Sequence, residues 1–234
     1  MKNRLDILET VLNYDTYVRT SGIDLSPSEV GSKGKYQIWL TNQGIPKSHP
    51  IATELKVNAV VGTAFHGRAE EAIKATYPEV YTEVDLYGFI DGIKVGGTSD
   101  VIYEWCDTYV VGDYKTMGAF GFKKAMRNDF LDYVPQLSIY SYLYAQMNDL
   151  PYSKYGELYI VVTGDAGYFR KDEGGGKTPK YVTETVELLD ESQVELLVRE
   201  TYDAIKTEPE MDCQDDGWNK CMYCELECMF RVQG

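Results

Sequence analysis

The stretch GGTSDVIYEWCDTYVVGDYKT, residues 96–116, decides how this chain is expected to fold and to act. Two strand-like apolar runs flank Cys106 and Asp107, which predicts two strands joined by a short connection. Asp113 and Lys115 are two residues apart on the second strand, so strand geometry places both side chains on one face. The hairpin also brings Asp100 of the first strand close to Asp113.

The charged residues of this hairpin stand at the end of an apolar segment. Tyr109, Val110 and Val111 precede Asp113, and charges are rarely placed beside a buried strand for stability alone. Two carboxylates at this spacing need a cation between them, and hard oxygen ligands suit Mg²⁺ or Mn²⁺. The alternative is an ordinary ion pair at the edge of a strand.

The rest of the chain indicates helices and strands in mixed order. The segment Ser26–Glu29 has the pattern of a helix start, with serine as the cap and proline at the first position. We expect an α/β domain over residues 1–206, built on a mixed β-sheet flanked by helices, with residues 207–234 as a cysteine-rich tail packed on it. The expected helices are 59–76, 132–147 and 190–206, and the expected strands are 80–90, 93–105, 108–115, 155–163 and 181–187.

Composition excludes several classes of protein. The chain has 234 residues, and its 23 basic and 37 acidic side chains give a net charge of −14. Such a charge argues against indiscriminate binding to nucleic acid or to anionic membranes. No apolar run approaches the roughly 20 residues of a membrane span, so we expect a cytoplasmic protein without a membrane partner.

Four of the five cysteines lie within sixteen residues of the tail, whereas Cys106 stands alone. In a reducing compartment such a cluster indicates metal binding more readily than disulfides. Local thiolate sites suit structural Zn²⁺, and a set of free thiols is the alternative. The clustered residues are Cys213, Cys221, Cys224 and Cys228.

Ordered motifs around the hairpin resemble a known family. An aspartate, a short hairpin and then Asp113-x-Lys115 resemble the signature of the PD-(D/E)xK nuclease superfamily. Upstream, the segment GTAFH ending at His66 is similar to the helical histidine motif of the RecB-like exonuclease branch. Downstream, Gln136-x-x-x-Tyr140 is similar to the Q-x-x-x-Y motif of that branch. The cysteine tail resembles that of iron–sulfur members, such as the AddB nuclease domain and the CRISPR adaptation nucleases.

The resemblance implies a restriction-endonuclease-like core and a set of site residues. The implied metal ligands for Mg²⁺ or Mn²⁺ are His66, Asp100, Asp113 and the backbone carbonyl of Tyr114. Asp100, Asp113 and Lys115 would be catalytic, with Lys115 holding or helping to deprotonate the attacking water. Glu83 would correspond to an accessory acidic position. The implied DNA-binding residues are Gln136 and Tyr140, joined by the basic cluster Lys123, Lys124 and Arg127, for which a solvated surface is the alternative.

The tail cysteines would then hold a [4Fe–4S] cluster, with Zn²⁺ as the alternative. The implied activity is that of a divalent-metal-dependent DNA exonuclease that hydrolyses phosphodiester bonds at ends or in single strands. It would act in recombination, repair or phage DNA processing, alongside recombination or replication proteins. Two other functions fit the same motifs. One is a non-catalytic DNA-binding or assembly module of this fold, and the other is a structure-specific endonuclease.

Overall fold

The computed structural model describes residues 22–30, 35–43, 53–164, 167 and 177–207. Within these ranges five strands form one sheet in the order β1-β2-β3-β4-β5. Strands β3 and β4 pair in parallel, and the other neighbours pair antiparallel, which confirms the mixed sheet predicted from the sequence. The strands are β1 (Tyr81–Ile90), β2 (Ile93–Trp105), β3 (Thr108–Gly118), β4 (Tyr155–Thr163) and β5 (Tyr181–Glu187).

Two tight turns connect the first three strands. Asp91 and Gly92 have φ angles of 50° and 76°, and Cys106 and Asp107 have φ angles of 47° and 62°. Two consecutive residues with positive φ match the right-handed twist of an antiparallel pair, which is why two-residue hairpins use this conformation. Both hairpins therefore lie where the sequence predicted them.

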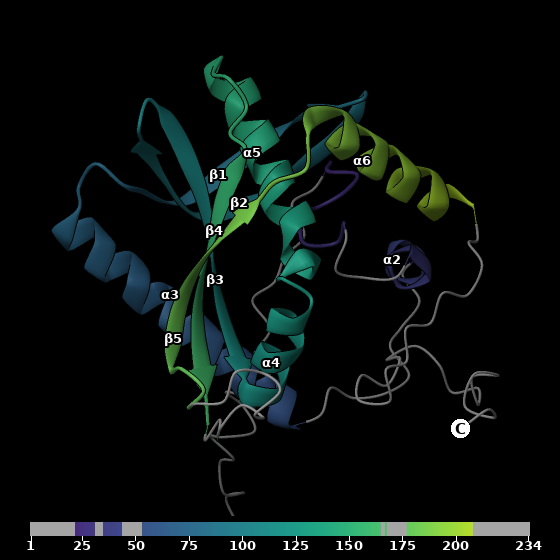
Figure 1. The fold of residues 1–234 in the computed structure, drawn as a ribbon. Helices are drawn as coiled ribbons and strands as arrows, with labels where there is room; N and C mark the ends of the chain where they lie inside the picture. Colours follow the sequence, from purple (N-terminus) through teal and green to yellow (C-terminus); the bar gives the residue numbers. More distant parts are fainter. Residues whose placement is uncertain (1–21, 31–34, 44–52, 165–166, 168–176, 208–234) are drawn as a thin grey trace, which may run out of the picture.

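Helices cover both faces of the sheet, with α3 on one side and α5 on the other (Figure 1). Helix α5 is buried nearly all round, because it packs against β1, β3 and β4 and also against α6. Leu137 and Leu143 of this helix are fully enclosed in the core. The helices are α2 (Lys35–Asn42), α3 (Thr53–Thr76), α4 (Ala119–Arg127), the 3₁₀ turn η1 (Leu131–Tyr133), α5 (Val134–Asn148) and α6 (Glu191–Lys206).

The N-terminal boundaries differ from those expected. Residues 26–30 form a turn rather than a helix, although the backbone N–H of Ser26 donates to the Glu29 carboxylate at 3.1 Å as in a capping box. Helix α2 begins only at Lys35, and α3 begins at Thr53, six residues before the expected start. Neither α2 nor α4 was predicted, because each is short and buries few residues.

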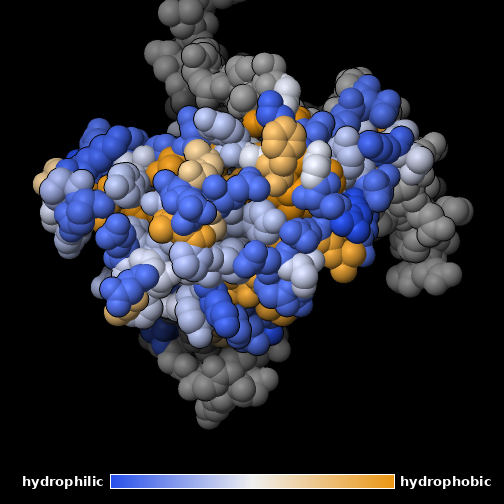
Figure 2. Space-filling view, turned by 90° about the horizontal axis from the view of Figure 1, so that it is seen from above, coloured by the Kyte–Doolittle hydropathy of each residue, from blue (hydrophilic) through white to orange (hydrophobic). Residues whose placement is uncertain are grey.

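The apolar face of α3 is more open than its sequence suggests. Val61 lies on the apolar stripe of α3, but 42% of its surface is exposed, and Val57 and Val60 are exposed beside it. Such residues are spread among polar ones over the described surface, and Figure 2 shows a largely hydrophilic face with apolar side chains between the polar ones. The described core lies instead between the sheet, α5 and α6.

Several expectations concern residues outside those that the structure describes. These include residues 1–21 of the expected α/β domain and the cysteine-rich tail beyond Thr207. The predicted [4Fe–4S] or Zn²⁺ ligands, Cys213, Cys221, Cys224 and Cys228, all belong to that tail and stay a prediction. No helix in the described ranges is both long and apolar enough to cross a membrane.

Candidate functional site

The second half of β3 brings Asp113 and Lys115 together on the face of the sheet that α5 covers. Lys115 Nζ lies 2.7 Å from Asp113 Oδ2, as the strand period predicts. Gln136 of α5 bridges the pair, because its Nε2 donates to Asp113 Oδ1 at 3.1 Å and its Oε1 accepts from Lys115 Nζ at 3.3 Å. One carboxylate, one ammonium and one amide thus form a closed polar network at the first turn of α5.

Asp100 lies beside this network at the point where β2 and β3 separate. Pairing between the two strands ends at Val101 and Gly112, so Asp100 and Asp113 lie just beyond the last pair. Asp100 Oδ2 accepts the backbone N–H of Tyr114 at 2.6 Å. Only 9% of Asp100 and 4% of Asp113 is exposed, and two carboxylates this deeply buried require a cation or a proton.

His66 reaches the same place from α3. Its Nδ1 lies 3.5 Å from Asp100 Oδ1, and its Nε2 lies 3.1 Å from the carbonyl oxygen of Tyr114. Its ring packs edge-on against the Tyr114 ring, as the neighbouring Phe65 ring does. The hydrogen bond with Asp100 raises the pKa of His66 above its ordinary value, although burial opposes this. Helix α3 therefore places an imidazole beside the two oxygens that the sequence proposed as metal ligands.

Glu83 of β1 is the acidic residue whose place in the site is least evident from the sequence. Thr82 pairs with Val101 and Val84 with Ser99, so Glu83 faces Asp100 in register but does not pair with it. Its φ of 50° is rare for a residue within a strand, and strain of this kind is often retained at functional sites. Burial, followed by the charge of Asp100, raises the pKa of Glu83.

The donor set in this region fits a divalent cation. One donor atom from each of His66, Glu83 and Asp100 lies within 4.8 Å of the others. Asp113 Oδ2 is buried and, among the described residues, accepts no hydrogen bond of acceptable geometry in addition to its ion pair. Carboxylate and carbonyl oxygens with one imidazole suit Mg²⁺ or Mn²⁺. A cation here would also offset the like charges that now raise the pKa of Asp113 beyond the effect of burial.

Tyr140 of the Q-x-x-x-Y motif is buried behind the polar network, of which Gln136 is itself a half-buried member. Gln136 Nε2 also lies 3.3 Å from the Tyr140 hydroxyl, and only 4% of Tyr140 is exposed. Burial also raises the pKa of Tyr140. This placement favours a role in holding Gln136 over the direct contact with DNA expected from the sequence, and that contact stays a prediction for both residues.

The predicted basic cluster lies on α4, which begins directly after β3. Lys124 and Arg127 are exposed and Lys123 is half-buried, so the cluster starts eight residues beyond Lys115 on the next element. On α3, Glu70 forms an ion pair with Lys74 one helical turn later.

Comparison with known proteins agrees with this arrangement. The family model for the PD-(D/E)XK nuclease superfamily matches residues 41–229. Among solved structures the chain is similar to SSO0001, with a TM-score of 0.52 and 17% identity, over 83% of this chain and 84% of that one. It is also similar to the protein named “Putative exonuclease” from Eubacterium rectale, with a TM-score of 0.35 and 15% identity, over 93% and 82% of the two chains. No curated protein sequence matches significantly.

At such low identity the likeness to SSO0001 concerns the fold alone, and it agrees with a mixed sheet flanked by helices. The family model supports a conclusion about the family as well as the fold, because it covers well over half of the chain and includes the residues from His66 to Tyr140. It supports nuclease activity and the use of divalent metal ions. The chain therefore belongs to the PD-(D/E)XK nuclease superfamily, as its motifs predicted.

Proposed function

We propose that the protein is a divalent-metal-dependent exonuclease that hydrolyses DNA at the site formed by β1, β2, β3, α3 and α5. The observation that carries the proposal is the group of acidic and imidazole donors, of which Asp100 and Asp113 are buried, beside a paired lysine. His66, Glu83 and Asp100 have donor atoms within 4.8 Å of one another, and Lys115 lies 2.7 Å from Asp113. In such a set the acidic and imidazole groups bind a cation, and the lysine ammonium contacts a phosphate.

The metal would be held by His66, Glu83, Asp100, Asp113 and the carbonyl of Tyr114. A divalent cation bound there supplies a water of lowered pKa and polarises the phosphodiester. The chain's own contribution begins with the rigid placement of these donors, since Asp100 accepts the Tyr114 N–H and so fixes the hairpin. Buried donors that are already in place need little rearrangement when charge develops.

Lys115 would act on the substrate phosphate. Its ammonium is held between Asp113 Oδ2 and Gln136 Oε1, and 24% of its side chain remains exposed. It can therefore donate to a phosphate oxygen that carries extra negative charge as water attacks phosphorus and the bond to the leaving oxygen breaks. Gln136 keeps the ammonium and the carboxylate in register during this step.

The choice of an exonuclease rests on the histidine and Q-x-x-x-Y motifs, which are similar to those of the RecB-like branch. A non-catalytic DNA-binding module is the less favoured function, because Asp100, Asp113 and Lys115 are all present, Lys115 pairs with Asp113, and Asp100 accepts the backbone N–H of Tyr114 between them. The basic residues of α4 would contact the DNA backbone next to the site, where charge from lysine and arginine contributes most of the non-specific affinity.

The test compares linear and circular single-stranded DNA of the same sequence, with Mg²⁺, Mn²⁺ or EDTA. An exonuclease degrades the linear form and leaves the circle intact, and EDTA abolishes the reaction. Cleavage of the circle at a similar rate would instead establish an endonuclease. Tight DNA binding without cleavage under any metal would establish the non-catalytic alternative.

Binding of Mn²⁺, followed by calorimetry, tests the metal ligands without reference to activity. We expect Glu83→Gln to weaken Mn²⁺ binding about tenfold or more, which is the size of effect seen when a metal site loses a supporting partner. Glu79→Gln is the matched control, because Glu79 is exposed and lies just before β1. Equal Mn²⁺ affinity of the Glu83→Gln variant and the wild type would exclude Glu83 from the site.

A further inference from the structure

The ammonium group of Lys115 has a third neighbour that the sequence motifs do not include. Lys115 Nζ lies 5.4 Å from the centre of the Tyr133 ring. This is within the roughly 6 Å over which the negative face of an aromatic ring attracts a cation. The ammonium is therefore held by the carboxylate of Asp113, the amide oxygen of Gln136 and the ring face of Tyr133, which lie on β3, α5 and η1 respectively.

Tyr133 shares a face of the helix with the two residues of the Q-x-x-x-Y motif. It is the last residue of η1 and immediately precedes α5, so Tyr133, Gln136 and Tyr140 follow one another at spacings of three and four residues. Such positions lie above one another on one side of a helix. All three side chains consequently lie toward the end of β3 that carries Asp113 and Lys115.

The turn before η1, at Asp129 and Phe130, is strained. At the end of α4, the N–H of Phe130 donates to the Ala125 carbonyl at 2.9 Å. The N–H of Asp129 donates to the Met126 carbonyl at 3.2 Å. This is the Schellman pattern, but Asp129 and Phe130 adopt its left-handed region, with φ of 46° and 56°, where glycine is usual.

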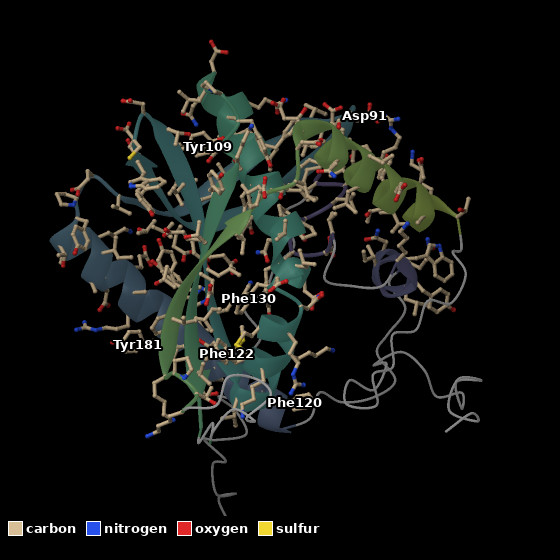
Figure 3. The ribbon with its side chains drawn as sticks, viewed as in Figure 1. Asp91, Tyr109, Phe120, Phe122, Phe130 and Tyr181 are labelled. Carbon is tan, nitrogen blue, oxygen red and sulfur yellow. The ribbon has the colours of Figure 1, made fainter. Side chains whose placement is uncertain are left out.

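A bulky residue such as phenylalanine is a genuine outlier in that region. Packing retains it here, since the Phe130 ring is buried 6.2 Å from that of Phe122, and Figure 3 shows the two rings close together near α4. The turn reverses the chain so that η1 returns over the end of β3. Backbone strain held in place by packing is a reason to ask what the next segment does.

We infer that Tyr133 is a positioning residue for Lys115, holding the ammonium toward the substrate phosphate through the face of its ring. The inference rests on the proposed function of Lys115. The alternative is that Tyr133 only packs against the core, which its half-buried side chain also does. A packing role depends on ring shape, whereas positioning of the ammonium depends on the electron density of the ring.

Fluorination separates the two roles, because it withdraws electrons from a ring while changing its shape little. In the full-length protein, Tyr133→Phe should keep kcat within about twofold, and mono-, di- and trifluorophenylalanine at position 133 should lower log kcat in proportion to fluorine number. Tyr133→Leu should lower kcat about tenfold, equivalent to about 1.4 kcal/mol, with KM and Mn²⁺ affinity unchanged. The same fluorinated residues at Phe122 are the matched control and should leave kcat unchanged.

A second readout does not require cleavage. The Lys115 Cε protons should resonate upfield in the wild type because of the ring current, and the shift should disappear in Tyr133→Leu. Equal kcat across the fluorinated series, or equal kcat for the phenylalanine and leucine variants, would overturn the inference. An inactive wild-type protein would overturn the proposed function instead. Absence of the upfield shift in the wild type would overturn the inference about Tyr133, because the ring and the ammonium would then not be in contact.

Discussion

Asp113→Asn should make the metal-free protein more stable while removing its activity. Asp113 is 4% exposed, and burial raises the pKa of its carboxyl from 3.8 to about 6 despite the opposing charge of Lys115. Because the folded state binds this proton more tightly than the unfolded state, the free energy of unfolding falls as the pH rises between these two values. The raised pKa of Asp113 corresponds to a loss of about 3 kcal/mol in the free energy of unfolding above pH 6.

Asparagine keeps the shape of aspartate and removes the buried charge. Its amide can still accept from Gln136 but turns an N–H toward Lys115, which offsets roughly 1 kcal/mol of the gain. We therefore expect the variant to be more stable by about 2 kcal/mol at pH 7.5, which raises Tm by about 4–8 °C for a chain of this size. Below about pH 3.8 this gain should be absent.

The assay is urea unfolding followed by circular dichroism, in EDTA, at a series of pH values from 3.5 to 8. Asp132→Asn is the matched control, because Asp132 is exposed on η1 and the same substitution there removes no buried charge. The reasoning would be refuted if Asp113→Asn were less stable than the wild type at pH 7.5. A stability gain that stayed constant over the whole pH range would refute it equally, since the gain would then not come from the charge.

Three further outcomes are expected. Gly112→Ala should destabilise the fold by about 1–3 kcal/mol in thermal or urea unfolding, because a Cβ there would come within 2.6 Å of the Tyr159 ring; an unchanged Tm would contradict this. Gln136→Leu should lower kcat at least tenfold with the fold intact, as it breaks two hydrogen bonds to charged groups, and a change below twofold would show that the bridge is dispensable. Asp190→Ala should lower Tm by about 2–4 °C at pH 7, because its carboxylate caps α6. The hydrogen bond from the Ser192 side chain, followed by the backbone bond of the cap, lowers the pKa of Asp190, so the difference should disappear only as the pH falls below about 3.8; equal Tm values at pH 7 would argue against the cap.

The hairpin at residues 96–116 shows how much of the fold local sequence determines. The turns at Asp91-Gly92 and Cys106-Asp107 and the relation of Asp113 to Lys115 depend on neighbours within a few residues, and the structure has them as predicted. The position of Glu83 depends on the pairing of β1 with β2 and on an unusual φ angle. No residue near it in sequence carries a signal for either.

Tyr133 and Tyr140 show the same limit within one helix. Four tyrosines lie between residues 133 and 144, and their spacing does not reveal which of them face the site and which only pack against the core. The distinction comes from the strained turn before η1 and from the packing of α5 against β1, β3 and β4. The exposure of Val61 on α3 has a related cause, since burial depends on what lies opposite a helix as well as on its own apolar residues.

The central claim is that one site joins metal binding to DNA hydrolysis through Lys115. The most direct measurement is single-turnover cleavage of end-labelled single-stranded DNA by the wild type and by Lys115→Met, each saturated with Mn²⁺. The variant should bind Mn²⁺ and DNA with nearly wild-type affinity and cleave at least about 10³-fold more slowly, as expected when a key electrostatic contact in the transition state is lost. Cleavage by Lys115→Met within tenfold of the wild-type rate would contradict the account.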